Sequence, residues 1–294
     1  MAAALAALFH GLGNSSNVSA EGRSIFVWQA RQWLQAGGDF SHGWLMPLVS
    51  LVFVARQWRA LRAAPKAVSA GGLWATAAGL ALHAAAFRAQ QPRLSAMALV
   101  GLTWTIPWAV WGPAVARRLL FPCGYLLLAV GSYALINFTF PLRLFASRAA
   151  VAVLNGLNIA AERSGTAIYS AAGGGFHFDV ADPCSGLRSL VVITALAAPY
   201  AYLTQRTTLR RWLLFGASLP LAMACNVLRI VTIALVAQAF GREQALRVYH
   251  DGSGFIIFAS ACLLLVGADR LLNLPYRRLL SSWNGPAGAP TSES

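Results

Sequence analysis

The apolar run of residues 212–240 reads WLLFGASLPLAMACNVLRIVTIALVAQAF. As one helix this run would be about 43 Å long at 1.5 Å per residue, which exceeds the hydrocarbon thickness of a membrane. It contains a single charged residue, Arg229, about 25 Å from its start. A charge inside a spanning helix is costly unless it faces a partner or a wet cavity, so Arg229 indicates a functional site.

Apolar runs of spanning length recur along the whole chain. Of its residues, 57% are hydrophobic and 11% are charged, whereas a soluble domain carries about 25% charged residues. This composition predicts an all-α fold, a polytopic transmembrane helical bundle of about seven to eight spans with an external interfacial segment. Besides 212–240, the runs are 42–58, 71–87, 94–116, 119–137, 185–204 and 254–272.

Clusters of basic residues between the runs predict the orientation and account for the net charge of +14. Such clusters mark cytoplasmic loops, and their expected partners are anionic lipid headgroups rather than nucleic acid. All of them can lie inside if 212–240 crosses once, and then 138–184 and 241–253 lie outside. The clusters are Arg56, Arg59, Arg62 and Lys66, then Arg117 and Arg118, which separate the third and fourth runs, then Arg206, Arg210 and Arg211, and then Arg270, Arg277 and Arg278.

Three parts of the chain differ in composition. Residues 1–40 are predicted to form an interfacial or weak transmembrane segment, 41–275 the main transmembrane domain, and 276–294 a disordered cytoplasmic tail. Within the external segment 138–184, we expect a helix near Arg143–Ala161 and a short strand at Phe176–Val180. Such irregular backbone at the interface is tolerated where it lines a cavity, so this segment could roof a substrate cleft.

Cys184 lies in the stretch 182–188, which reads as the start of a helix. Asp182 is a good N-cap, and Pro183 suits the first helical position. Cys184 then falls in the first turn, where the helix dipole lowers the pKa of a thiol and favours the nucleophilic thiolate. Arg188, one turn further on, adds positive potential. The other cysteines are interpreted as packing residues: Cys123, Cys225 and Cys262.

Two more segments bring polar residues to the predicted outer face. Asn226 and Arg229 share one helix face, and the guanidinium could stabilise a thiolate or an oxyanion, or else reach lipid phosphate. His250, followed by Asp251, precedes the last run and is of the residue type most used for proton transfer. Rival histidines on this face are His42 and His177, whereas His10 and His83 are interpreted as structural.

Five blocks of sequence resemble the signature blocks of the exosortase/archaeosortase family, in the same order along the chain. They are Pro183–Ser189, Asn226–Arg229 and His250–Gly254, together with Ser41–Pro47 and Glu162–Ile168. The likeness covers about residues 39–272. That family has about eight spans, and the N-terminal part of this chain is short by comparison.

The resemblance implies a membrane-embedded cysteine transpeptidase or protease of the bacterial inner membrane, with its active site on the periplasmic face. Such an enzyme cuts a C-terminal sorting signal from exported proteins, often in species that make extracellular polysaccharide. The signal is a short motif such as Pro-Glu-Pro, a transmembrane helix and a basic tail, and the new carboxyl end passes to an acceptor. The catalytic residues would be Cys184, Arg229 and His250, with no metal or organic cofactor, and Asp182, Arg188, Asn226, His42 and Asp251 would support them.

Three other functions are compatible with parts of the sequence. A transporter or channel would use the spans and Arg229 without covalent chemistry. An intramembrane serine protease would use Ser185 or Ser189 with His250, although Ser185 lacks the Gly-x-Ser-x-Gly setting of a nucleophile elbow. A structural membrane component would tolerate substitution at all of these positions.

Overall fold

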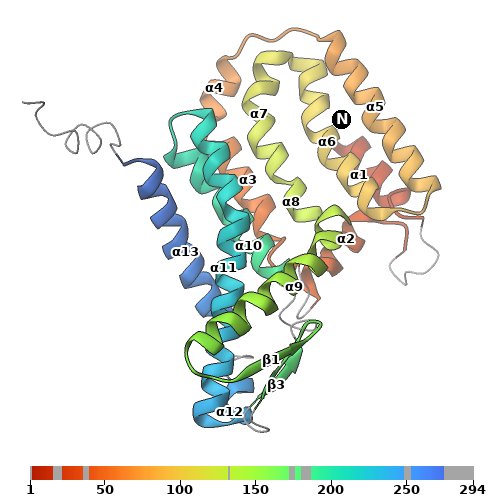
Figure 1. Ribbon diagram of the computed structural model, residues 1–294. Coiled ribbons are helices and arrows are strands. Elements are labelled where there is room, and N and C mark those ends of the chain that lie inside the picture. The colour runs from red at the N-terminus through yellow and green to blue at the C-terminus, as the bar shows by residue number, and fades with distance from the viewer. Residues whose placement is uncertain are drawn as a thin grey trace, which may run out of the picture.

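The computed structural model describes residues 2–15, 22–35, 40–131, 133–171, 176–179, 187–247 and 253–274. The first half is a set of helices joined by short turns (Figure 1). Its helices are α1 (Ala2–Gly11), α2 (Ile25–Leu34), α3 (Leu45–Arg56), α4 (Trp58–Ala63), α5 (Ala70–Arg88), α6 (Pro92–Trp111), α7 (Pro113–Tyr125) and α8 (Leu127–Val130).

The second half combines long helices with one small sheet. The sheet is antiparallel, in the order β1-β2-β3, and follows the oblique helix α9. Only its last strand was expected from the sequence, so the all-α prediction is corrected by this three-stranded addition. The elements are α9 (Tyr133–Gly156), β1 (Ala161–Ser164), β2 (Ala167–Ser170), β3 (His177–Asp179), α10 (Leu187–Thr204), α11 (Thr208–Phe240), α12 (Arg242–Arg247) and α13 (Ser253–Leu272).

Within the described residues, four helices are long and apolar enough to cross a membrane: α5, α6, α7 with α8, and α11. That is fewer than the seven to eight spans expected, and α3 shows one reason. It has only 12 residues, about 18 Å of helix, because the backbone turns at Gln57 before α4. Helices α10 and α13 have 18 and 20 residues and pack beside α11. The chain is therefore a helical membrane protein.

Two helix boundaries differ from those expected, and a glycine with positive φ causes each. The pair Arg117–Arg118 was expected to separate two runs, but the break lies earlier, at Gly112 (φ 86°), and α7 begins at the following proline. A second break falls at Gly131 (φ 75°), inside the expected run 119–137. The external helix expected near Arg143–Ala161 is consequently the later part of α9.

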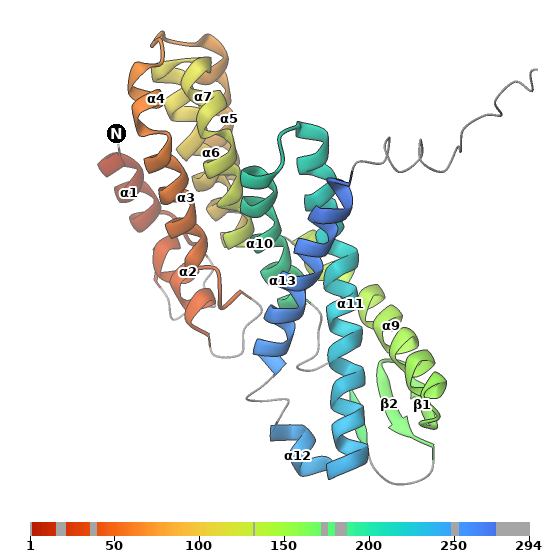
Figure 2. The same cartoon turned by 90° about the vertical axis from the view of Figure 1, so that its left-hand side faces the viewer.

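The ends of the helices that carry basic clusters gather in the upper part of both views (Figures 1 and 2). Helix α4, the start of α7, the connection between α10 and α11, and the end of α13 all lie there. The far end of α11 lies at the bottom with α9, the sheet and α12. The four basic clusters thus lie towards one end of the bundle, and the sheet lies at the other.

The lower end has its own hydrophobic core, which we call the outboard platform. It joins α9 through Leu154, the sheet through Ile168, and the last turns of α11 through Ile230, all three of them fully buried. Ala245 of α12 completes it from below. Because one core joins these four elements, the platform fixes the sheet to the end of α11.

The N-terminal helices α1 and α2 have ten residues each and pack on the rest of the bundle. Phe9 and Trp28 share a core cluster with residues of α6. The ring of His83 on α5 lies 4.1 Å from that of Phe9 and shares a 2.9 Å hydrogen bond with Ser95 of α6. His83 therefore has the structural role expected of it.

Candidate active site

Arg229 is buried in α11, with only 5% of its surface exposed. Its Nη2 donates a 2.9 Å hydrogen bond to Oδ1 of Asn226, which is buried one turn earlier. The Nε–H of Arg229 has no acceptor among the described residues. An arginine that snorkelled to lipid headgroups would be exposed at its tip, so burial favours an internal role. Asn226 therefore holds the guanidinium on one side, while its Nε–H stays available to donate to another group.

The packing of α10 on α11 sets the level of Arg229 within the bundle. The two helices are antiparallel, and Oγ1 of Thr194 shares a 3.4 Å hydrogen bond with Oγ of Ser218. Leu187, the first residue of α10, precedes Thr194 by seven residues, and the same count forward from Ser218 reaches Cys225. Arg229 follows Cys225 by four residues, so it lies about 6 Å, one helical turn, beyond the level at which α10 begins.

Helix α13 gives the same result from another side. Ala261 packs with Ala222 in one cluster, and Leu265 packs with Leu214 in the next. The same counting from these two pairs brings Arg229 level with Gly254 and with a point three residues before the start of α13 at Ser253. Arg229 is therefore within about one turn of the start of α13, and Figure 2 shows both helix starts beside the middle of α11.

His42 lies on a tightly packed loop between α2 and α3. Phe40 sits against Gly131, where a Cβ would come within 2.4 Å of its ring, and Gly43 sits against the indole of Trp33. The Nε1–H of Trp33 donates to the carbonyl of Ala129 at 3.0 Å. His42 itself is exposed and shares a 3.3 Å hydrogen bond with Ser41. The packing of Phe40 and Gly43 thus helps to hold the loop.

This loop lies against a different side of α10 from Arg229. Phe40 shares a cluster with Val191, whereas Leu190 and Ile193 pack on α11. The rings of Phe53 and Tyr202 lie 5.5 Å apart, so α3, which follows the loop, packs on α10.

The remaining predicted residues divide into two groups. Arg188 lies in the first turn of α10, and Ser189 follows it. His177 begins β3, and His10 shares a 3.1 Å hydrogen bond with Ser24. The other predicted positions lie outside the described residues: Asp182, Cys184, Ser185, His250 and Asp251.

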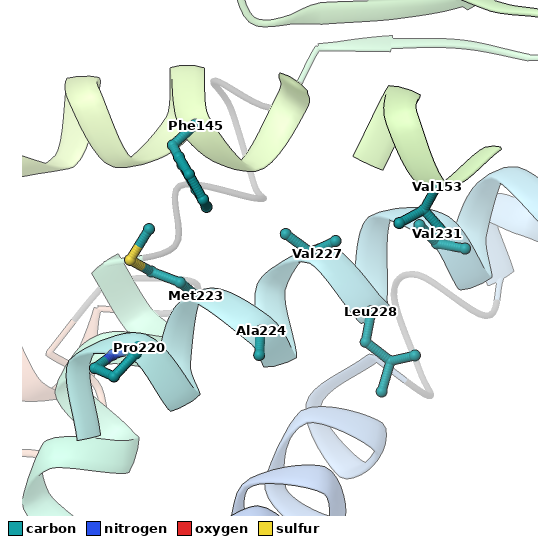
Figure 3. A pocket seen from close by; sticks show the side chains of 8 residues that line it. All are labelled: Phe145, Val153, Pro220, Met223, Ala224, Val227, Leu228 and Val231. Carbon is teal, nitrogen blue, oxygen red and sulfur yellow. The ribbon is translucent and has the colours of Figure 1, made fainter. Parts of the chain in front are cut away.

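An apolar groove of about 460 Å³ runs between α9 and α11 (Figure 3). Its lining carries no polar or charged side chain. Val227 lies in this lining and Arg229 follows it by two residues, which is about 200° around the helix. The groove and the guanidinium therefore occupy opposite faces of α11. Its lining residues are Phe145, Val153, Pro220, Met223, Ala224, Val227, Leu228 and Val231.

Two kinds of supporting residue could not be found in the sequence. Gln29 and Trp33 both donate to the carbonyl of Ala129, at 3.1 and 3.0 Å, about a hundred positions away. Asn155 binds both backbone groups of Ala161. No local sequence pattern predicts such hydrogen bonds, because the fold determines which backbone group each side chain reaches. Within the described residues, no group of three or more His, Cys, Asp or Glu side chains could hold a metal ion.

The comparison with protein families identifies the family of this chain. A family model described as a transmembrane exosortase matches residues 31–267, which include all five blocks singled out in the sequence. Neither a curated protein nor a solved structure matches the chain. The match covers most of the chain and both halves of the bundle, and the chain therefore belongs to the transmembrane exosortase family.

Proposed function

We propose that this protein is a cysteine transpeptidase or protease of the bacterial inner membrane, working on its periplasmic face. Its substrates would be exported proteins that end in a short motif, a transmembrane helix and a basic tail. The family supports processing of such sorting signals in general. The residues that would act are Cys184, Arg229 and His250.

One observation carries the proposal: the buried Arg229 lies within about one helical turn of the levels at which α10 and α13 begin. Cys184 precedes Leu187 by three residues, and His250 precedes Ser253 by three. Three residues of chain reach at most about 11 Å. We therefore expect both residues to lie near the guanidinium, and this spacing along the chain supports that expectation. A transporter gives no reason for this coincidence.

The chemistry follows from the types of these three groups. The thiolate of Cys184 attacks the carbonyl carbon of the scissile amide, and a tetrahedral oxyanion forms. Arg229 donates to that oxyanion through the N–H groups that Asn226 leaves available. His250 gives a proton to the leaving amine, which departs with the transmembrane helix. The product is a thioester on Cys184.

The thioester is resolved by a second nucleophile. His250, now neutral, takes a proton from the incoming acceptor, which attacks the thioester carbonyl and releases the thiolate. An amine acceptor gives a transferred product, and water gives simple proteolysis. Four supporting residues are assigned around this centre: Asp182 as helix cap, Arg188 as positive potential, Asp251 beside His250, and Asn226 as the group that positions Arg229. His42, whose loop lies against another side of α10, is assigned a substrate-binding role away from the guanidinium.

The decisive experiment compares two cysteines. A reporter with an exported domain, a Pro-Glu-Pro motif, an apolar helix and a basic tail is produced together with the protein, and its new C-terminus is identified by mass spectrometry. Cys184→Ala should abolish processing, whereas Cys262→Ala, which alters a half-buried thiol of α13, should leave it unchanged. Normal processing by Cys184→Ala would disprove the nucleophile.

Trapping tests the intermediate separately. Hydroxylamine attacks thioesters, so its addition should yield a reporter that ends in a hydroxamate. If the wild-type protein processes the reporter and no hydroxamate forms, no thioester is present. The covalent step through Cys184 is then wrong, even if Cys184→Ala is inactive. A reporter cut by Cys184→Ser at the normal rate would instead favour a different nucleophile.

A further inference from the structure

The three-stranded sheet has two outer edges, and its hydrogen bonds define which backbone groups point away from each. The N–H of Ser170 donates to the carbonyl of Phe176 at 3.0 Å, and Ile168 pairs with Phe178. In antiparallel sheets every second residue faces its partner strand. His177 and Asp179 therefore direct their backbone N–H and C=O groups away from β2.

The edge formed by β1 is closed by a side chain. By the same alternation, Ala161 points its backbone groups away from β2. Asn155 of α9 satisfies both of them: Ala161 N–H donates to its Oδ1 at 2.9 Å, and its Nδ2 donates to the Ala161 carbonyl at 3.2 Å. Helix α9 also packs along this strand. A peptide could not pair here without displacing Asn155.

The edge formed by β3 has no such cover among the described residues. The outward N–H and C=O groups of His177 and Asp179 have no partner in the described part of the chain, and the side chain of His177 is exposed. Paired strands satisfy such groups, so an open edge is a template for another extended chain. Asp179 precedes Cys184 by five residues, which keeps the two within about 18 Å.

We propose that the outer edge of β3 binds the extended segment of the substrate that precedes its scissile bond, as a fourth strand of the sheet. The inference rests on the proposed function, because it assigns the substrate's place at that same site. Main-chain hydrogen bonds would supply affinity with little demand on side chains. The substrate runs parallel to β3, since both chains lead towards the membrane and Cys184.

The sheet is suited to this role because it cannot shift freely. Ile168 of β2 is fully buried in the outboard platform, together with Ile230 of α11, one residue after Arg229. A strand added to β3 would therefore be held at a fixed position relative to α11, which carries Arg229. Fixed geometry of this kind places a scissile carbonyl near its catalytic groups.

Matched substitutions test the backbone donor. Asp179→Pro removes the outward N–H but no bond to β2, while Asp179→Ala removes the carboxylate and keeps the N–H. We expect Asp179→Pro to lower kcat/KM for the Pro-Glu-Pro reporter about 10-fold, and Asp179→Ala to stay within about 2-fold of wild type. Equal rates for the two variants would overturn the proposal.

A control on the closed edge separates binding from general damage. Arg163 also points its backbone groups off the sheet, but from β1. Arg163→Pro should leave processing unchanged, because no substrate pairs there. If it loses as much activity as Asp179→Pro, the effect is disruption of the sheet and the proposal fails.

Cross-linking gives a readout that needs no turnover. His177→Cys is combined with Cys184→Ala, and single cysteines are placed at successive positions of the reporter before its motif. Strand pairing predicts disulfides at every second position. Disulfides at consecutive positions, or none, contradict strand addition. The proposed function has its own test: it is wrong if Cys184→Ala alone still processes the reporter, whatever the cross-linking pattern.

Discussion

Nη2 of Arg229 donates to Oδ1 of Asn226 across 2.9 Å, one helical turn apart on α11. The amide accepts from one arm of the guanidinium, and the Nε–H has no acceptor among the described residues. A lone arginine on a helix could adopt several rotamers, whereas this pair restricts it. Asn226 is thus a positioning residue for Arg229.

Replacing Asn226 by Leu should therefore lower activity without removing the charge. Loss of a hydrogen bond to a charged group costs about 1.5–3 kcal/mol, which corresponds to a fall in kcat of about 10- to 100-fold. Thr232→Val is the matched control, because Thr232 lies on the same helix and binds only the carbonyl of Leu228. Unchanged kcat in Asn226→Leu would show that Arg229 is oriented by something else.

Arg229→Lys separates charge from shape. Lysine keeps one positive charge but loses the planar fork, so it cannot hold Asn226 and an oxyanion in the same way. We expect kcat to fall by about 10²–10³, as for loss of an oxyanion donor, with the protein still inserted in the membrane. If Arg229→Lys processes the reporter at the wild-type rate, the positive charge is sufficient and the shape of the guanidinium is not needed.

Gly131→Ala should destabilise the protein and disturb the loop that carries His42. Gly131 has φ 75°, and a Cβ there would come within 2.4 Å of the Phe40 ring. A non-glycine residue in this conformation costs about 1–3 kcal/mol. The thermal midpoint in detergent should fall, whereas that of Gly124→Ala should not, because a Cβ on Gly124 meets nothing within 4 Å.

Asp269 offers a contrast at the opposite end of the bundle. Its carboxylate accepts from Tyr200 at 3.1 Å and from Asn273 at 3.1 Å, and also from Gln205, so it joins α10 to α13. Asp269→Ala should lower the thermal midpoint, since each charged hydrogen bond contributes about 1.5–3 kcal/mol. At a temperature where the variant stays folded, kcat should remain near wild type, because the proposed site lies at the other end. A large loss of kcat would show that the two ends are coupled.

Apolar periodicity and charge predicted the helical membrane class and singled out Arg229 and Asn226, because both signals are local. The helix breaks at Gly112 and Gly131 were missed, since hydropathy continues across them and only the positive φ reveals the turn. Strands β1 and β2 were missed as well, because four-residue strands leave almost no periodic signal. The predicted grouping with Cys184 and His250 stays a prediction.

The 33 residues of α11 make it about 50 Å long, against a hydrocarbon layer of about 30 Å. An upright helix of this length would extend about 20 Å beyond the layer, and the outboard platform is built on its last turns. In a thicker bilayer less of α11 would extend beyond the acyl chains, and the platform would lie closer to them. Lipids with longer tails should therefore lower the rate of the proposed reaction without any change in sequence.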